Sequence, residues 1–121
     1  MIAIIFEVWP EDGQKDAYLS HATTLRPIAE DTEGFLGVER FQSLTNPDKL
    51  LSVSFFEDEA AVARWREQPI HRAVQSAGRK SIFRDYRLRV AQVLRDYGMT
   101  ERDQAPSDSQ AHHGAGSTAP E

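Results

Sequence analysis

The sequence contains no cysteine, which excludes disulfide scaffolds, thiolate nucleophiles, iron–sulfur clusters and cysteine-based zinc sites. It also lacks a basic run, and its formal net charge of −5 provides no electrostatic footprint for a nucleic-acid backbone. No stretch approaches the roughly 20 apolar residues of a transmembrane helix. The apolar start, MIAIIFEVWP, is interrupted by Glu7 and has no positively charged region before it, unlike a secretory signal. We therefore expect a cytoplasmic protein that binds neither nucleic acid nor membrane.

Several catalytic signatures are missing as well. The chain has no glycine-rich dinucleotide loop after a strand, no phosphate-binding P-loop and no Gly-x-Ser-x-Gly elbow. No pair of histidines has helical ligand spacing together with a carboxylate partner. The sequence therefore indicates no metal site and no nucleotide cofactor.

The composition changes near residue 98. From Thr100 onward the chain has no Leu, Ile, Val, Phe, Trp or Tyr, so this part buries too little apolar surface to offset its ordering entropy. We therefore expect one folded domain over residues 1–98 and a disordered tail over 99–121. The adjacent His112 and His113 in this tail are interpreted as solvated side chains rather than as a metal site.

The patterning within residues 1–98 predicts an α+β fold. β-Branched and aromatic runs predict strands, four-residue and three-residue spacings of apolar side chains predict helices, and Asn46-Pro47-Asp48 predicts a hairpin turn. Pro69 is expected to stop or kink the second helix. The expected order is strand 2–9, helix 14–30, strand 34–44, strand 49–57, helix 58–78 and strand 85–97. This is the ferredoxin-like β-α-β-β-α-β arrangement, a four-stranded antiparallel sheet under two helices.

The first strand does not alternate between apolar and polar residues. One face carries Ile2, Ile4, Phe6 and Val8, and the other carries Ala3, Ile5, Glu7 and Trp9. Both faces therefore need cover, whereas two helices cover only one. A homodimer in which the second faces of two copies pack together would supply it. The alternative is that the outer face is simply apolar at a few positions, which is common in proteins.

The chain resembles the antibiotic biosynthesis monooxygenase (ABM) domain family over Ile2 to Gly98. The resemblance depends on the segments IIFEVWPEDGQKDAYLSHATTLRP, EGFLGVERFQS, LLSVSFFEDEAAVARWREQPIHRAVQSAGR and FRDYRLRVAQVLRDYG, and on their order and spacing. It implies a dimeric α/β barrel in which two ferredoxin-like units join sheet to sheet. It also implies a ligand between the helices and the sheet of one subunit, a cleft in which Glu7 would lie beside Trp65.

The resemblance suggests a cofactor-independent monooxygenase acting on a small aromatic or polyketide-like molecule, which supplies its own electrons once deprotonated. Trp65, His71 and Glu7 are the candidate catalytic residues. A histidine suits the role of base because its ordinary pKa lies near neutrality, and burial would raise the pKa of Glu7. The candidate substrate-binding residues are Trp9, His21 and Phe55.

Haem-degrading members of this family offer another function. They use an asparagine on the first strand, a tryptophan on the second helix and a haem-ligating histidine about ten residues beyond it. Here the corresponding residues are Glu7, Trp65 and Gln75. Because glutamine is not among the usual haem ligands, haem degradation is disfavoured. His71, six residues past Trp65, should point away from it unless Pro69 redirects the chain.

Structural roles are the alternatives for these residues. Trp65 follows Ala61 and Val62 at core spacing, His21 lies at the edge of an apolar face, and His71 sits near a helix start. Glu7 is costly in an apolar strand unless paired, for which Arg40, Arg87 or Arg89 is available. A non-catalytic ligand-binding or stress-associated barrel is therefore the alternative function.

Overall fold

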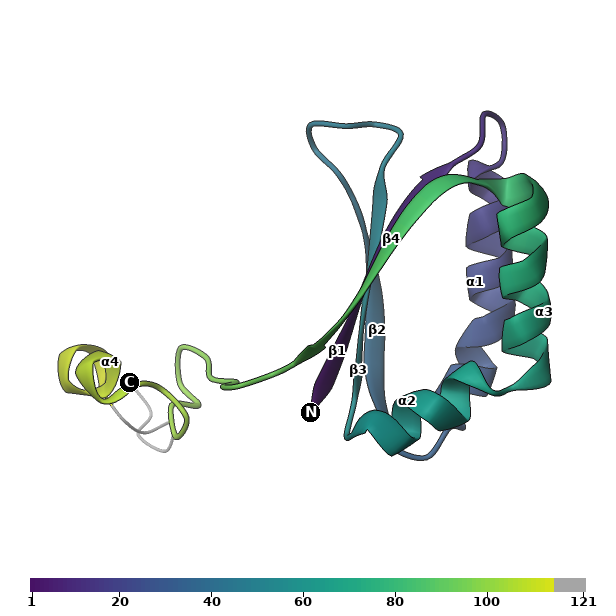
Figure 1. Ribbon diagram of the computed structural model, residues 1–121. Helices are drawn as coiled ribbons and strands as arrows, with labels where there is room; N and C mark the ends of the chain where they lie inside the picture. Colours follow the sequence, from purple (N-terminus) through teal and green to yellow (C-terminus); the bar gives the residue numbers. More distant parts are fainter. Residues whose placement is uncertain (115–121) are drawn as a thin grey trace.

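The computed structural model describes residues 1–114 and contains a four-stranded antiparallel sheet with helices on one face (Figure 1). In chain order the elements are β1 (Ile2–Pro10), α1 (Lys15–Glu30), β2 (Phe35–Gln42), β3 (Leu50–Phe56), α2 (Glu59–Arg66), α3 (Pro69–Ala77), the π-helical turn η1 (Gly78–Ile82), β4 (Phe83–Gln92) and α4 (Ser107–His113). The strand order is β2-β3-β1-β4. The expected ferredoxin-like α+β fold is confirmed.

The local signals explain most of the element boundaries. Asp58 caps α2, where its carboxylate accepts a hydrogen bond from the Ala61 amide at 2.9 Å. In the β2–β3 hairpin turn, the Asn46 side chain accepts from the Asp48 amide at 3.0 Å. Gly34 precedes β2 with a φ of +88°, and a Cβ there would lie 2.6 Å from that of Ala61, so only glycine fits.

Pro69 divides the second helical segment into two helices. It occupies the first turn of α3, where its missing amide hydrogen costs nothing, and Gln68 before it is extended with φ −60° and ψ 128°. The chain therefore changes direction between Arg66 and Pro69, and α3 starts on a new axis (Figure 1).

The core is packed at both ends of the sheet's inner face. At one end Val8, Tyr18, Leu50 and Ile82 form a buried cluster. At the other end Phe56 is only 1% exposed. The middle of β1 between these ends is only half-buried, so the helices stand off the centre of the sheet.

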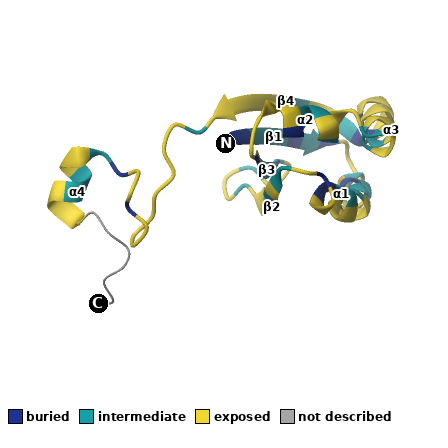
Figure 2. Cartoon of the chain, turned by 90° about the horizontal axis from the view of Figure 1, so that it is seen from below, coloured by how far each residue is buried: buried dark blue, intermediate teal, exposed yellow. Residues whose placement is uncertain are grey.

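The outer face of the sheet has no helix over it (Figures 1 and 2). Phe41 and Phe55 are 45% and 37% exposed there, beside partly covered apolar side chains of β1 and β3. The outer face is therefore partly apolar and uncovered in the single chain. No helix within residues 1–114 has the length and apolar character needed to cross a bilayer.

The C-terminal segment differs from the disordered tail expected over 99–121. Residues 99–114 form turns and the helix α4, and Arg102 is only 7% exposed. Its guanidinium donates to the carbonyls of Gly98, Ser109 and Gly114, and lies 5.5 Å from the Tyr97 ring. The hydrogen bonds of Arg102, together with the buried Ala105, therefore hold this segment together. The expectation for residues 115–121 lies outside the described residues, and the boundary at residue 98 stays a prediction.

Candidate active site

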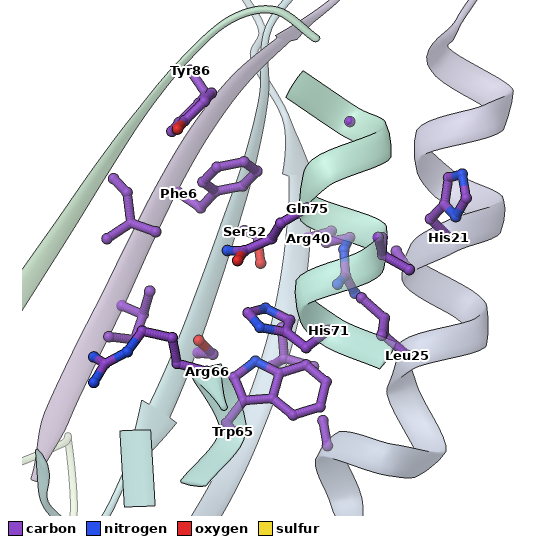
Figure 3. A pocket seen from close by; sticks show the side chains of 18 of the residues that line it. Phe6, His21, Leu25, Arg40, Ser52, Trp65, Arg66, His71, Gln75 and Tyr86 are labelled. Carbon is purple, nitrogen blue, oxygen red and sulfur yellow. The ribbon is translucent and has the colours of Figure 1, made fainter. Parts of the chain in front are cut away.

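A cavity of about 530 Å³ lies between the middle of the sheet and the helices. This is a suitable volume for a small organic ligand, for which pockets of roughly 300–1,000 Å³ are usual. Its floor is formed by inward-facing strand residues and its roof by α1, α2 and α3 (Figure 3). The exposed wall surface is mostly apolar. Side chains with a polar group also contribute to it; these are Tyr18, His21, Arg26, Arg40, Ser52, Ser54, Trp65, Arg66, His71, Gln75, Arg79 and Tyr86.

Trp65 and His71 lie against each other at this cavity. Their ring centroids are 4.4 Å apart and the ring planes are inclined by 40° (Figure 3). Trp65 lies in the last turn of α2 and His71 in the first turn of α3, so the break at Pro69 brings together two side chains that a continuous helix would separate. The sequence predicted that His71 would point away from Trp65 unless Pro69 redirected the chain, and Pro69 does redirect it.

His71 is a half-buried imidazole whose Nδ1 is buried without a hydrogen-bond partner in the described part of the chain. Burial lowers the pKa of His71 below its usual 6.5, the nearby Arg66 carbonyl opposes this, and the charge of Arg72 adds to the lowering. The lowered pKa favours the neutral imidazole, which is the form that can accept a proton.

Glu7 does not lie in this cavity, and the prediction that it shares a cleft with Trp65 is wrong. Side chains alternate along β1, so Phe6 faces the helices and Glu7 faces the other side. There its carboxylate pairs with Lys49 and Arg89. These hydrogen bonds, from Lys49 first and then Arg89, lower the pKa of Glu7, the opposite of the rise expected for a buried base.

The candidate substrate-binding residues are divided between the two faces. His21 on α1 lines the cavity. Trp9 and Phe55 were predicted to wall the cavity, but both lie on the outer face because they share the strand alternation of Glu7. The Trp9 ring instead stands 5.1 Å from the Lys49 ammonium. Of the predicted site residues, Trp65, His71 and His21 thus line the same cavity, and Trp65 and His71 contact each other.

Sequence reasoning missed Arg40 as a cavity residue, having considered it only as a partner for Glu7. Arg40 lies opposite Ser52 across the β2–β3 ladder, and both residues line the cavity. Arg40 is two residues from Val38 on β2, so strand alternation puts both side chains on the same face. Since an apolar Val38 is expected to face inward, this spacing could have placed Arg40 in the cavity. Nearby, burial raises the pKa of the Tyr18 phenol while the positive charge of Arg40 opposes the rise.

The haem alternative is not favoured by the geometry. Gln75, at the position of the expected iron ligand, does line the cavity, but its amide is not among the usual ligands of haem iron. Within residues 1–114 no cluster of three or more His, Asp or Glu side chains is arranged to hold a metal ion.

The family profile described as antibiotic biosynthesis monooxygenase matches residues 1–77, which is more than half of the chain. The chain belongs to the ABM family. This ABM protein is 43% identical over 93 residues to "Jasmonate monooxygenase ABM" of Pyricularia oryzae, an alignment that covers 77% of this chain and 43% of that protein. It thus spans less than half the length of this relative.

Two further comparisons support the family and the fold. The ABM protein is 32% identical to the protein YqjZ of Bacillus subtilis, over 77% of this chain and 79% of the relative. Among solved structures it resembles Rv0793 of Mycobacterium tuberculosis with a TM-score of 0.72, 13% identity, and coverage of 80% and 98% of the two chains. At that identity the likeness concerns the fold alone.

Proposed function

We propose that this ABM protein is a monooxygenase that oxidises a small aromatic or polyketide-like molecule in the cavity under Trp65 and His71. The observation that carries the proposal is the half-buried imidazole of His71, held against Trp65 at a mostly apolar cavity of about 530 Å³. In such a site His71 can act as the base for an acidic substrate and Trp65 can stack against it. The apolar walls keep most water away from the reaction.

The chemistry proposed needs no external reductant. His71 removes a proton from an acidic CH₂ group flanked by aromatic or carbonyl groups, and the carbanion transfers electrons to O₂ to form a peroxide. Loss of water from this peroxide, with the second C–H proton, leaves a ketone. The balance is R₂CH₂ + O₂ → R₂C=O + H₂O, so the substrate supplies four electrons and O₂ accepts four. The Trp65 indole N–H serves as a donor to the developing oxygen anion.

Oxygen uptake by the purified protein tests this proposal. The panel contains anthrone, whose CH₂ group lies between two aromatic rings, together with jasmonate because of the name of the Pyricularia relative. Uptake that falls at least tenfold in Trp65→Phe supports the enzymatic function. If no compound is turned over, the non-catalytic ligand-binding alternative replaces it.

We also propose that the protein is a homodimer joined through the outer face of the sheet. Support comes from the exposed rings of Phe41 and Phe55 and from the absence of any helix on this face among the described elements. The ion pairs of Glu7 with Lys49 and Arg89 lie on the same face and would supply polar contacts around the apolar centre. Sedimentation equilibrium at micromolar concentration distinguishes a dimer from a monomer.

A further inference from the structure

The charge around the cavity is all of one sign. Its lining contains the four arginines Arg26, Arg40, Arg66 and Arg79 and no aspartate or glutamate. The protein as a whole carries a net charge of −5, so this is a local separation of charge and not a consequence of composition. A cavity walled by arginines and apolar side chains attracts an anion.

Two of these four arginines are already engaged. Arg26 pairs with Glu30 at 3.3 Å on the outer surface of α1. Arg79 donates to the Tyr86 hydroxyl at 2.6 Å and lies 5.8 Å from that ring. Their charges are thus partly satisfied by other groups before any ligand arrives.

Arg66 makes no ion pair within residues 1–114 either, but this residue is exposed to solvent. Arg40 is the exception, because it is partly buried and no carboxylate within residues 1–114 pairs with it. Its guanidinium makes no ion pair in this range, and its Nε is buried without a hydrogen-bond partner. The Tyr18 hydroxyl interacts with the guanidinium, but a neutral phenol does not balance its charge. Its strand neighbour Glu39 faces the opposite side of the sheet, where it cannot help. A guanidinium stays charged under all physiological conditions, so it cannot relieve this cost by losing a proton.

Burying part of a charged group without an oppositely charged partner has a cost, which an anionic ligand would offset. The planar guanidinium fork matches a carboxylate, with which it forms two parallel hydrogen bonds. Figure 3 shows the Arg40 side chain between the sheet and the helices, on the same side as His71. A ligand held by Arg40 would therefore extend its apolar part along the cavity beside the Trp65–His71 pair.

We infer that the cavity binds an apolar carboxylic acid in its ionised form, and that Arg40 holds the carboxylate. The partly buried guanidinium of Arg40, which has no carboxylate partner, favours a single anionic group, and the apolar walls favour a hydrocarbon or aromatic body. This inference depends on the proposed function only in taking the cavity as the substrate site. Binding itself needs neither oxygen nor turnover.

Isothermal titration with 2-naphthoate and with 2-naphthamide tests the inference. The two probes share one aromatic body and differ in charge. We expect the wild-type protein to bind the acid roughly 10- to 100-fold more tightly, since hydrogen bonds to charged groups are worth about that factor. Arg40→Gln is expected to remove this preference. The control Arg84→Gln, which makes the same charge change at an exposed position of β4 outside the cavity, should retain it.

Thermal unfolding separates this role from a structural one. Because Arg40 is unpaired without ligand, Arg40→Met should melt at or above the wild-type temperature. Naphthoate should raise the melting temperature of the wild type but not that of this variant. Equal binding of acid and amide, an acid preference that survives Arg40→Gln, or Arg40 variants that fail to fold would each overturn the inference.

These results are independent of catalysis. Acid-selective binding without oxygen uptake from any panel compound would leave the inference intact and remove the proposed monooxygenase function. Oxygen uptake with neutral substrates and no preference for acids would support the monooxygenase function and overturn the inference about Arg40.

Discussion

Replacing His71 with phenylalanine tests the role of the Trp65–His71 pair most severely. In the wild type the centroids of the Trp65 and His71 rings are 4.4 Å apart. Phenylalanine keeps an aromatic ring at this position but cannot accept a proton. A positioned general base contributes roughly 10²- to 10⁴-fold to rate, about 2.7–5.4 kcal/mol of barrier at 1.36 kcal/mol per factor of ten. We therefore expect kcat for the best panel compound to fall by that factor, with ligand affinity little changed.

The pH profile of the wild type gives a second, independent readout of the role of His71. The base works when unprotonated, so kcat/KM should rise with pH and level off above an inflection that lies below 6.5, because burial lowers the pKa of His71. Initial rates of oxygen uptake, measured with an oxygen electrode from about pH 5 to 8, give this profile. His112→Gln, which changes a histidine outside the cavity, is the control. Full activity in His71→Phe, or an inflection well above 6.5, would refute the role of His71 as base.

Three other predictions concern stability and assembly. Phe56→Ala should lower the free energy of unfolding by about 3–5 kcal/mol in urea titrations, whereas Leu44→Ala, fully exposed in the β2–β3 turn, should change it by less than about 0.5. Since its ion pairs depress the pKa of Glu7 below 4.5, the stability that this carboxylate contributes is present above that pH and is lost as the pH falls through the lowered value. Glu7→Gln should therefore melt below the wild type near neutrality and converge with it in acid; a gap that is constant with pH would contradict this. Phe55→Glu should give a monomer in sedimentation equilibrium if the outer face is the dimer interface, and an unchanged mass would argue against that interface.

The order of the elements could be predicted from the sequence because turns, caps and apolar spacing agree along residues 1–92. The first strand shows where such reasoning stops. Its alternation correctly separated Phe6 from Glu7, but both faces are apolar, so the strand alone does not say which one receives the helices. The family resemblance was used to choose the face, and it placed Glu7 on the wrong side.

The candidate site depends on contacts that spacing does not encode. Trp65 and His71 meet because Pro69 restarts the helix on a new axis, and the direction of that axis is set by tertiary packing. Beyond the domain, Arg102 orders residues 98–114 through hydrogen bonds to backbone carbonyls. The prediction of a disordered tail used only the number of apolar residues, which says nothing about hydrogen bonds of this kind. Arg40 could have been placed from alternation, but its lack of a partner is visible only in three dimensions.

The most direct test of the account is a reaction of the purified protein, freed of metal and flavin, with the best panel compound under ¹⁸O₂ without added reductant. The account predicts a ketone carrying a single ¹⁸O atom, the second ¹⁸O in water, one O₂ consumed per product, and loss of this product in His71→Phe. Product formation only after a reductant or cofactor is added, or two labelled atoms in the product, would contradict it.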